Sequence, residues 1–552
     1  MRDIWTAGPE ASGESYVAMR AGFRWDVPAT FNFGSDVIDR WAQERDGPAL
    51  IWRNAAGAAR TLTYSDMATE TNRLGNVLRA HGIAAGDRVL VMLPRIPEWM
   101  TALVGALKIG AVPIPCIEML TPRDIEYRVR NSGAKAVICR AEQADKFVAV
   151  TGEVPVRIAI GGEAGSPADW LDWSRALAAA AETLEAAVVR ADDPAIMYYT
   201  SGSTGHPKGV LHAARALYAW RVSAMYWLDL RPGERIWCTA DTGWSKAGTS
   251  ILFGPLSCGA ASFFYDGPFV PSERLKLLAE HGVTVYCAPA TELFRLVDEN
   301  IAAYDLSALR RVVSSGEAMN PVVAGRWEAA TGLRVDEAYG QTETLMTVLN
   351  YPGEPVKYGA MGRPSPGSEL AVIDEAGRRL AQGEEGALAL LTPNPQMMLG
   401  YWQDEARTAA AHVEGPEGRW YLTGDRASFD ADGYLWYRGR ADDVINSAGY
   451  RIGPLEVENA LLEHAAVQAC AVVGSPDTER GEIVKAFVVL RAGHAPSDAL
   501  ARELQDHVKH VTAPYKYPRA VAFIAALPLT ATGKIKRRDL RDQEYAKADA
   551  AP

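Results

Sequence analysis

The 552-residue chain lacks the sequence signals of several common metal, disulfide and nucleotide-binding proteins. Its six cysteines form no C-x-x-C pair, which excludes the usual zinc-site spacings and a dense disulfide framework. Neither a Walker A motif nor a G-x-G-x-x-G after a predicted strand occurs, so neither kind of nucleotide loop is indicated. The H-E-x-x-H and G-x-S-x-G motifs are also absent, which excludes zincin peptidases and the nucleophile elbow of α/β-hydrolases.

The charge balance argues against a nucleic-acid-binding protein. The chain has 57 Lys and Arg against 68 Asp and Glu, a formal net charge of −11, whereas nucleic-acid binders are normally basic. Unpaired cysteines and the absence of a secretion signal predict a cytoplasmic protein.

One apolar stretch, residues 99–120, is long enough to span a bilayer. It contains Lys108, Glu118 and prolines 113 and 115, so it predicts a buried helix followed by a strand rather than membrane insertion.

Apolar strand patterns alternate with helical patterns over the first 190 residues, and strands of the same kind recur up to residue 313. This alternation predicts an α/β fold with parallel or mixed sheets covered by helices. Between residues 371 and 391, short strands separated by turn residues predict a small β-rich subdomain. The main expected elements are strands at 87–93, 134–139, 195–199 and 283–287, and helices at 97–109 and from residue 122.

The organisation changes again near residue 440. A polar stretch there is followed by helix and strand patterns at 455–464, 467–473, 485–490 and 498–509, which is enough for a separate α+β unit. We therefore predict a large N-terminal domain, residues 1–439, and a small mobile C-terminal domain, residues 440–552.

The segment YYTSGSTGHPKGV, residues 198–210, has the composition of a phosphate-binding loop. Glycines let backbone N–H groups approach an anion closely, hydroxyls add donors, and Lys208 adds a positive charge. A flexible linker of this composition would rarely begin at the end of a strand and finish in Pro-Lys-Gly-Val. The residues predicted to bind a polyphosphate are Thr200, Ser201, Gly202, Ser203, Thr204, Gly205, His206, Pro207 and Lys208.

This loop resembles that of the ANL adenylate-forming superfamily, which includes acyl-CoA synthetases, peptide-synthetase adenylation domains and luciferases. The resemblance extends over nearly the whole chain. Further segments resemble the family's core motifs in the family's order: YGQTET at 339–344, YLTGD at 421–425, RADD at 440–443 and LPLTATGK at 527–534. Three others are similar to medium-chain acyl-CoA synthetases: DTGW at 241–244, NSAGYRIGP at 446–454 and TAPYKYPR at 512–519.

The resemblance implies the roles of the nucleotide-binding residues. Glu343 and Thr204 would hold Mg²⁺, a cation that prefers oxygen ligands. Thr342 would lie beside the α-phosphate and the acyl carboxylate, and Asp425 would accept hydrogen bonds from the ribose hydroxyls. Arg440 would contact the ribose or the phosphates, and Asp442 would be the hinge. The other residues expected at ATP are Gly316, Glu317, Ala318, Glu337, Ala338, Tyr339, Gly340 and Gln341.

The resemblance also implies the catalytic, CoA and acyl sites. Lys534 matches the catalytic lysine of the C-terminal motif, and Lys208, Thr342 and Glu343 would act with it. CoA would meet Ala448, Gly449 and Tyr450, together with the basic residues Arg480, Lys509 and Arg519. The residues expected to line the acyl pocket are Trp244, Thr249, Ala288, Gly316 and Leu345.

These expectations predict an ATP-dependent acid–CoA ligase that uses ATP, CoA and Mg²⁺. It would form an acyl-adenylate with release of pyrophosphate, and then an acyl-CoA thioester with release of AMP. A medium-chain fatty acid is the predicted substrate. Several relatives carry Gly at the position of Leu345, which narrows a passage here, and some carry Trp at the position of Thr249, which opens space here. A branched or aromatic, benzoate-type acid is therefore the alternative. A nucleotide-binding protein without catalysis is a second hypothesis, disfavoured by the intact phosphate loop, Glu343 and Lys534.

Overall fold

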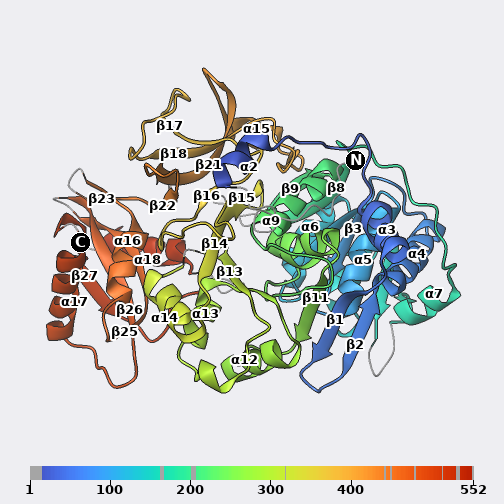
Figure 1. The fold of residues 1–552 in the computed structure, drawn as a ribbon, viewed down its shortest axis with the longest axis horizontal. Helices are drawn as coiled ribbons and strands as arrows, with labels where there is room; N and C mark the ends of the chain where they lie inside the picture. The colour runs from blue at the N-terminus through green and yellow to red at the C-terminus, as the bar shows by residue number, and fades with distance from the viewer. Residues whose placement is uncertain are drawn as a thin grey trace.

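Five β-sheets organise the described chain, one of nine strands, three of five strands and one of three strands, with helices packed around them (Figure 1). The computed structural model describes residues 15–161, 167–200, 207–317, 319–440, 443–447, 450–477, 480–512, 514–529 and 535–549. The principal helices are α2 (Tyr16–Gly22), α3 (Arg40–Glu44), α4 (Tyr64–Ala80), α5 (Pro97–Lys108), α6 (Pro122–Ser132), α7 (Trp173–Ala179), α8 (Ala214–Ala219), α9 (Arg221–Tyr226), α12 (Pro271–Glu280), α13 (Ala290–Leu296), α14 (Pro321–Thr331), α15 (Glu405–Ala410), α16 (Pro454–Leu462), α17 (Asp498–Val511) and α18 (Arg537–Asp549).

Two sheets built mainly of parallel strands form the bulk of the N-terminal part. The larger has the order β16 (Arg363–Pro364), β15 (Leu345–Leu349), β14 (Val335–Gln341), β13 (Arg311–Ser315), β12 (Val285–Cys287), β10 (Arg235–Cys238), β11 (Ala261–Asp266), β1 (Pro48–Asn54) and β2 (Ala59–Thr63). The smaller is parallel throughout, with the order β4 (Val112–Cys116), β3 (Arg88–Met92), β5 (Ala136–Arg140), β6 (Val156–Ile160) and β7 (Leu171–Asp172).

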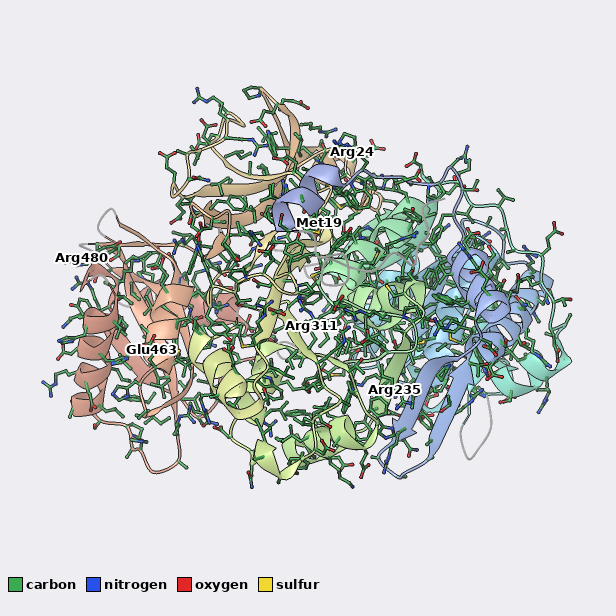
Figure 2. The ribbon with its side chains drawn as sticks, viewed as in Figure 1. Met19, Arg24, Arg235, Arg311, Glu463 and Arg480 are labelled. Atoms are coloured by element: carbon green, nitrogen blue, oxygen red, sulfur yellow. The ribbon has the colours of Figure 1, made fainter. Side chains whose placement is uncertain are left out.

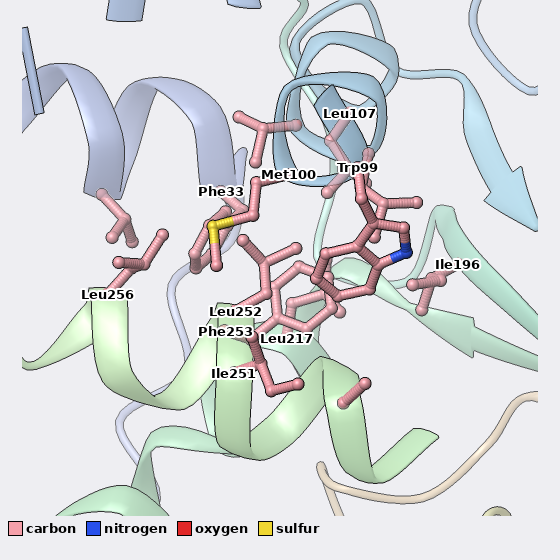
Figure 3. Packing of buried hydrophobic residues seen from close by; sticks show 14 of the residues in the cluster. Phe33, Trp99, Met100, Leu107, Ile196, Leu217, Ile251, Leu252, Phe253 and Leu256 are labelled. Atoms are coloured by element: carbon pink, nitrogen blue, oxygen red, sulfur yellow. The ribbon is translucent and has the colours of Figure 1, made fainter. Parts of the chain in front are cut away.

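Helices α5 and the segment from α10 (Ser245–Ala247) through the π-helix η3 (Gly248–Phe253) to α11 (Gly254–Ser257) pack between these sheets. In Figure 3 the rings of Trp99 and Phe253 and the side chain of Met100 meet in this interface. Trp99, Met100 and Phe253 have no exposed surface. Burying large apolar side chains contributes about 1.5–3 kcal/mol each, so this interface is a main stabilising contact of the fold.

Residues 99–120 form the predicted buried helix and strand, α5 and β4. Lys108 has no exposed side-chain surface, and its ammonium binds Asp39 at 2.5 Å and Asn72 at 2.6 Å. A buried charge must be paired and hydrogen-bonded, and these contacts meet that requirement. Within the described part of the chain, no helix combines the length and apolarity needed to cross a bilayer.

Local sequence sets the ends of α6, the helix expected from residue 122. Thr121 caps it in a capping box with Asp124, Pro122 occupies the first turn, and Gly133 ends it at φ 61°. Pro has no N–H to leave unbonded at this position, and Gly tolerates the left-handed conformation. The expected strands at 87–93, 134–139 and 283–287 are also present, as β3, β5 and β12.

Two antiparallel sheets complete the N-terminal part. One has the order β19 (Gly400–Tyr401), β9 (Lys208–Ala213) and β8 (Pro194–Thr200). The other joins β17 (Leu370–Ile373), β18 (Gly386–Leu391), β21 (Gly418–Phe429) and β20 (His412–Gly415), with β22 (Leu435–Arg440) paired to β21. The expected strand at 195–199 therefore exists as β8, but it belongs to a hairpin with β9 rather than to the parallel sheets, because its partner follows it directly in the chain.

The C-terminal part has its own sheet and core. Strands β24 (Tyr450–Ile452), β23 (Ile445–Ser447), β26 (Gly481–Leu490) and β25 (Val467–Asp477) lie in this order, and β27 (Ala520–Phe523) pairs with β26. The core consists of apolar residues from these strands with α16 and α17. Figure 1 places this unit beside α13 and α14 of the N-terminal part. The two-layer α+β arrangement matches the fold class predicted from sequence.

Candidate active site

Strands β8 and β9 hold the two ends of the predicted phosphate loop. Thr200 and Lys208 are cross-strand partners at the tip of the hairpin. The intervening predicted residues, Ser201, Gly202, Ser203, Thr204, Gly205 and His206, lie outside the described residues. Pro207 is described, and its carbonyl accepts a hydrogen bond of 3.0 Å from the Tyr127 hydroxyl of α6. Helix α6 therefore anchors the C-terminal end of this loop.

The hairpin of β14 and β15 presents Thr342 and Glu343 at its turn. Gln341 pairs with Leu345 across this turn, and Leu345 adopts a φ of 53°. A Cβ atom at residue 340 would lie 2.0 Å from the Leu345 carbonyl oxygen, so only Gly340 permits the strands to approach this closely. The sequence YGQTET therefore folds into a tight turn that projects one hydroxyl and one carboxylate.

The Lys208 ammonium and the Glu343 carboxylate form an ion pair of 2.7 Å. The Tyr401 hydroxyl joins them, at 2.9 Å from Lys208 Nζ and 2.9 Å from Glu343 Oε1. Glu343 is only 7% exposed. Tyr401 was not predicted from the sequence, because nothing in its local sequence marks it. Only the pairing of β19 with β9 brings it to the site.

Asp425 and Arg440, predicted from separate motifs to contact the ribose, are cross-strand partners in the β21–β22 hairpin. Their side chains approach to 3.4 Å. Asp425 Oδ2 accepts hydrogen bonds of 2.5 Å from the Tyr339 hydroxyl and 2.7 Å from Gln341 Nε2. These donors come from β14. They therefore connect Asp425, the candidate ribose-binding residue, to the hairpin that carries Thr342 and Glu343.

The described candidate residues for the adenine lie on β14 or directly follow β13. Glu337 Oε1 accepts a hydrogen bond of 2.8 Å from the Met319 amide, and burial raises the pKa of Glu337 to about 8. Ala338 is buried and pairs with Ser315, while Gly316 and Glu317 follow β13 directly. Ala318 lies outside the described residues. The structure thus brings the described members of this group to one edge of the large sheet.

His212 forms a hydrogen bond with the backbone of Thr342. This imidazole has no exposed surface, and its Nε2 lies 2.8 Å from the Thr342 carbonyl oxygen. A carbonyl can only accept, so Nε2 carries the proton in this bond. Burial lowers the pKa of His212 to about 4, which keeps the ring neutral at physiological pH.

This burial predicts a pH-dependent stability. Because the folded-state pKa lies below the unfolded value of about 6.5, the unfolded chain binds an extra proton between pH 6.5 and 4. The His212 contribution is therefore fully present above pH 6.5 and falls by up to about 1.4 kcal/mol per pH unit on acidification. Urea unfolding at pH 7, 6 and 5 should show a shallower pH slope for His212→Gln, which keeps a donor for Thr342. Equal slopes in both proteins would contradict this assignment.

Hydrogen bonds connect the α10–η3 segment, which follows the acyl-pocket candidate Trp244 and contains Thr249, to the turn at Thr342 and to β13. The Ser245 hydroxyl lies 3.2 Å from the Thr342 hydroxyl, and Lys246 Nζ donates to the Ser315 carbonyl at 2.9 Å. These bonds tie Trp244 and its neighbours to the turn at Thr342 and to the end of β13 before Gly316. Thr249 and Ala288 have no exposed surface, Leu345 is 2% exposed, and Gly316 is exposed.

The basic CoA candidates separate into two places. Lys509 Nζ and the Arg519 guanidinium both lie over the Tyr517 ring, at 4.4 Å and 4.9 Å from its centroid, so the structure brings these two together. Arg480 precedes β26 and lies at the outer edge of the C-terminal unit (Figure 2). Tyr450 begins β24, whereas Ala448 and Gly449 lie outside the described residues. The sequence analysis did not identify Tyr517.

The predicted hinge residue Asp442 and the predicted catalytic Lys534 both lie outside the described residues. On either side of Lys534, Leu529 and Ile535 pair with each other. Arg537 then binds both carboxylate oxygens of Glu458, at 3.0 Å and 2.6 Å, which fixes the start of α18.

The side chains present fit a magnesium ion only in combination with a bound nucleotide. Among the residues that the structure describes, no group of three His, Cys, Asp or Glu could hold a metal ion by itself. Glu343 offers one carboxylate, and its Oε1 accepts the hydrogen bonds from Lys208 and from Tyr401. Mg²⁺ is typically held by one or two carboxylates with substrate phosphates and water, so Glu343 fits that role.

Comparisons with known proteins agree with this geometry. A model described as AMP-binding enzyme matches residues 38–402, and one described as AMP-binding enzyme C-terminal domain matches residues 456–534. The chain belongs to the AMP-binding enzyme family. Neither match contains residue 440, so the predicted domain boundary there stays a prediction.

Individual relatives cover almost the entire chain. The acyl-coenzyme A synthetase ACSM3, mitochondrial, of Mus musculus is 38% identical over 560 residues, covering 99% of this chain and 96% of that protein. ACSM5, mitochondrial, of Homo sapiens is 39% identical over 535 residues, covering 94% and 92%. The crystal structure of the anthranilate CoA ligase AuaEII with anthranoyl-AMP has a TM-score of 0.86 at 31% identity, covering 95% and 99%. The predicted superfamily, fold class and AMP-forming acid–CoA ligase are confirmed.

The predicted cytoplasmic location is wrong by the same comparison, because both relatives are named as mitochondrial proteins. The prediction relied on unpaired cysteines and on the absence of a secretion signal. Reduced cysteines occur in more than one compartment inside a cell, so they do not distinguish the cytoplasm from the mitochondrion. The described cysteines are all buried and free, which fits either compartment.

Proposed function

We propose that this acid–CoA ligase activates a medium-chain carboxylic acid with ATP and transfers the acyl group to CoA. The main support is the convergence of Lys208, Thr342 and Glu343 with Asp425 and Arg440 at the meeting point of three sheets. The Lys208 ammonium and the Glu343 carboxylate at one end suit the phosphates of ATP. The hydrogen-bonded Asp425 carboxylate at the other end suits the ribose. The relatives are named acyl-coenzyme A synthetases.

The first half-reaction joins two anions. A carboxylic acid is already ionised at neutral pH, so its attack on the α-phosphate requires charge neutralisation and alignment rather than a general base. Lys208 and Lys534 would supply positive charge, and the Thr342 hydroxyl would orient the α-phosphate and the carboxylate. Glu343, with Thr204, would hold Mg²⁺, which neutralises phosphate charge when bound. Pyrophosphate leaves, and the acid becomes a mixed anhydride with AMP.

The second half-reaction attacks that anhydride with the CoA thiol. We assign the nucleotide end of CoA to Lys509 and Arg519, the two cations at the Tyr517 ring, because two positive charges beside one aromatic ring suit a phosphate-bearing ligand. Arg480 would add a third charge, and Ala448, Gly449 and Tyr450 would border the thiol arm. The C-terminal domain, residues 440–552, would turn about Asp442 between the half-reactions.

A panel of acids tests this function. Saturated acids of increasing length, a branched acid, benzoate and 2-aminobenzoate would be assayed with ATP and Mg²⁺, with and without CoA. We expect pyrophosphate without CoA, AMP and thioester with CoA, and the highest kcat/KM for an acid of intermediate length. Release of ADP and phosphate would contradict the adenylation mechanism.

An aromatic or branched acid is the second candidate. It is favoured by the buried Leu345, which occupies space at the turn beside Thr342, and by the similarity to a ligase solved with anthranoyl-AMP. A shortened, wider pocket suits a ring better than an extended chain. The same panel distinguishes the two, because benzoate or 2-aminobenzoate would then exceed every saturated acid.

Leu345→Gly should move the preference toward longer acids. The residue has a φ of 53°, which Gly adopts without strain, and the exchange removes a buried leucine side chain. One methylene in an apolar pocket changes selectivity about 10- to 200-fold, so the kcat/KM ratio of a long to a short acid should rise at least tenfold. Leu349→Ala, four positions along the same strand, is the matched control. An unchanged acid profile in Leu345→Gly would place Leu345 outside the pocket.

A further inference from the structure

Tyr401 occupies a position between the two charged groups of the phosphate site. Its hydroxyl lies 2.9 Å from Lys208 Nζ and 2.9 Å from Glu343 Oε1, and the ammonium lies 4.3 Å from its ring centroid. The side chain is 8% exposed. One hydroxyl therefore contacts both the predicted phosphate-binding cation and the predicted metal-binding carboxylate.

The backbone around Tyr401 is bound to both motifs. The Trp402 amide donates to the Gly209 carbonyl at 2.8 Å, next to Lys208, and the Met398 amide donates to the Glu343 carbonyl at 2.9 Å. The Tyr401 amide donates to Thr408 Oγ1 at 2.9 Å. Residues 398–402 thus connect the strand after the phosphate loop to the hairpin of Glu343, so the backbone that carries Tyr401 is bound to both motifs.

The hydrogen atoms available on Lys208 and Tyr401 determine which group donates in each of the two hydrogen bonds of the Tyr401 hydroxyl. A lysine ammonium only donates, so the Tyr401 oxygen accepts from Lys208 and its single proton goes to Glu343.

We infer that Tyr401 is a positioning residue of the phosphate and metal site: its hydroxyl orients the Glu343 carboxylate and holds it when Lys208 turns to an incoming phosphate. Anionic phosphates compete with Glu343 for the Lys208 ammonium. When that competition breaks the ion pair between Lys208 and Glu343, the hydrogen bond from the Tyr401 hydroxyl to Glu343 Oε1 remains. Glu343 Oε2 then stays available to a cation. The inference rests on the proposed function, since it assigns the details of the same site.

Tyr401→Phe tests this role, because phenylalanine keeps the ring beside Lys208 and loses only the hydroxyl. The probe is Mn²⁺ with an ATP analogue that carries a methylene between the α- and β-phosphates, and free Mn²⁺ is read by electron paramagnetic resonance. A hydrogen bond to a charged group corresponds to about a 10- to 100-fold effect, so the Kd for Mn²⁺ should rise at least tenfold. Pyrophosphate release should show the same rise in the Mg²⁺ concentration for half-maximal rate.

Two comparisons separate positioning from a general structural effect. Tyr351→Phe also removes a buried hydroxyl, which donates to the Pro364 carbonyl at 2.7 Å, and it should leave the Mn²⁺ titration unchanged. In a Glu343→Gln background, Tyr401→Phe should cause almost no further loss, because the two side chains act on one interaction. Fully additive losses, or a parent-like Mn²⁺ titration in Tyr401→Phe, would overturn the inference.

The readouts distinguish this inference from the proposed function. If the parent protein releases no pyrophosphate with any acid in the panel, the ligase proposal fails. The Mn²⁺ titration of Tyr401→Phe requires only a bound nucleotide analogue and still decides whether the hydroxyl orients Glu343. Thermal unfolding of both variants by circular dichroism supplies the check that a changed titration occurs in folded protein.

Discussion

Lys534→Ala should slow acyl-adenylate formation about 100- to 1,000-fold while the transfer of supplied acyl-adenylate to CoA stays near the parent rate. A preorganised charge at the reacting phosphate typically supplies an effect of this size. The described neighbours support such a position. Arg537, which begins α18 just after Lys534, acts on the pKa of Tyr437, and the Tyr437 ring lies 6.3 Å from that of Tyr339. The start of α18 is therefore near the candidate nucleotide site.

Burial raises the pKa of Tyr437, and the Asp425 charge adds to this rise, whereas Arg440 and Arg537 oppose it. Charged side chains of β21, β22 and α18 therefore act on the Tyr437 phenol. The proposed role of Lys534 in adenylation requires that this side of the C-terminal unit faces ATP, and the proposed transfer step would use a second orientation.

The measurement separates the half-reactions. Pyrophosphate exchange reports adenylation, and thioester formation from chemically prepared acyl-adenylate reports transfer. Lys536→Ala is the matched control, because Lys536 lies two positions away and its ammonium is 3.7 Å from Asp539. It should leave both half-reactions unchanged. Equal slowing of both half-reactions in Lys534→Ala would contradict alternation of the domains and make Lys534 a shared binding residue.

The fold was predictable from sequence where local patterns determine structure. The apolar stretch at 87–93, the Thr-Pro start of α6 and the strand–helix alternation of the C-terminal part all appear as expected. The hairpin partner of the strand at 195–199 was not expected, because antiparallel pairing of β8 with β9 depends on which strand edge is available. A buried apolar run reads alike in a parallel sheet and in a hairpin.

The candidate site was predictable only through its motifs. Glu343, Asp425 and Lys208 belong to short polar strings that stand out in the sequence. Tyr401 does not, and it contacts Lys208 from 193 positions away in the chain. Such a contact arises from the register of β19 on β9, which no local pattern specifies. His212 was missed for a similar reason, since one buried histidine in a strand resembles an ordinary core residue.

Asp425→Asn should raise the KM for ATP about 30- to 5,000-fold, with a smaller effect on kcat. In the parent, Asp425 is 4% exposed and its Oδ2 accepts from the Tyr339 hydroxyl and from Gln341 Nε2. An amide in this place offers one acceptor in place of two and turns N–H groups toward existing donors. Loss of one partner from a buried charged hydrogen-bond set commonly costs about 2–5 kcal/mol, which corresponds to the expected change in affinity.

Asp430→Asn provides the control, because Asp430 follows the same strand β21 and is equally committed to hydrogen bonds. Its Oδ2 binds Lys357 at 2.7 Å and Trp436 Nε1 at 3.0 Å, away from the cross-strand pair of Asp425 and Arg440. Both variants should lose some stability, but only Asp425→Asn should lose ATP affinity, measured as KM and as direct binding by calorimetry. ATP binding like the parent's in both variants would contradict this role. The hydrogen bonds around Asp425 would then only hold β14 against the β21–β22 hairpin, and other residues would bind the ribose.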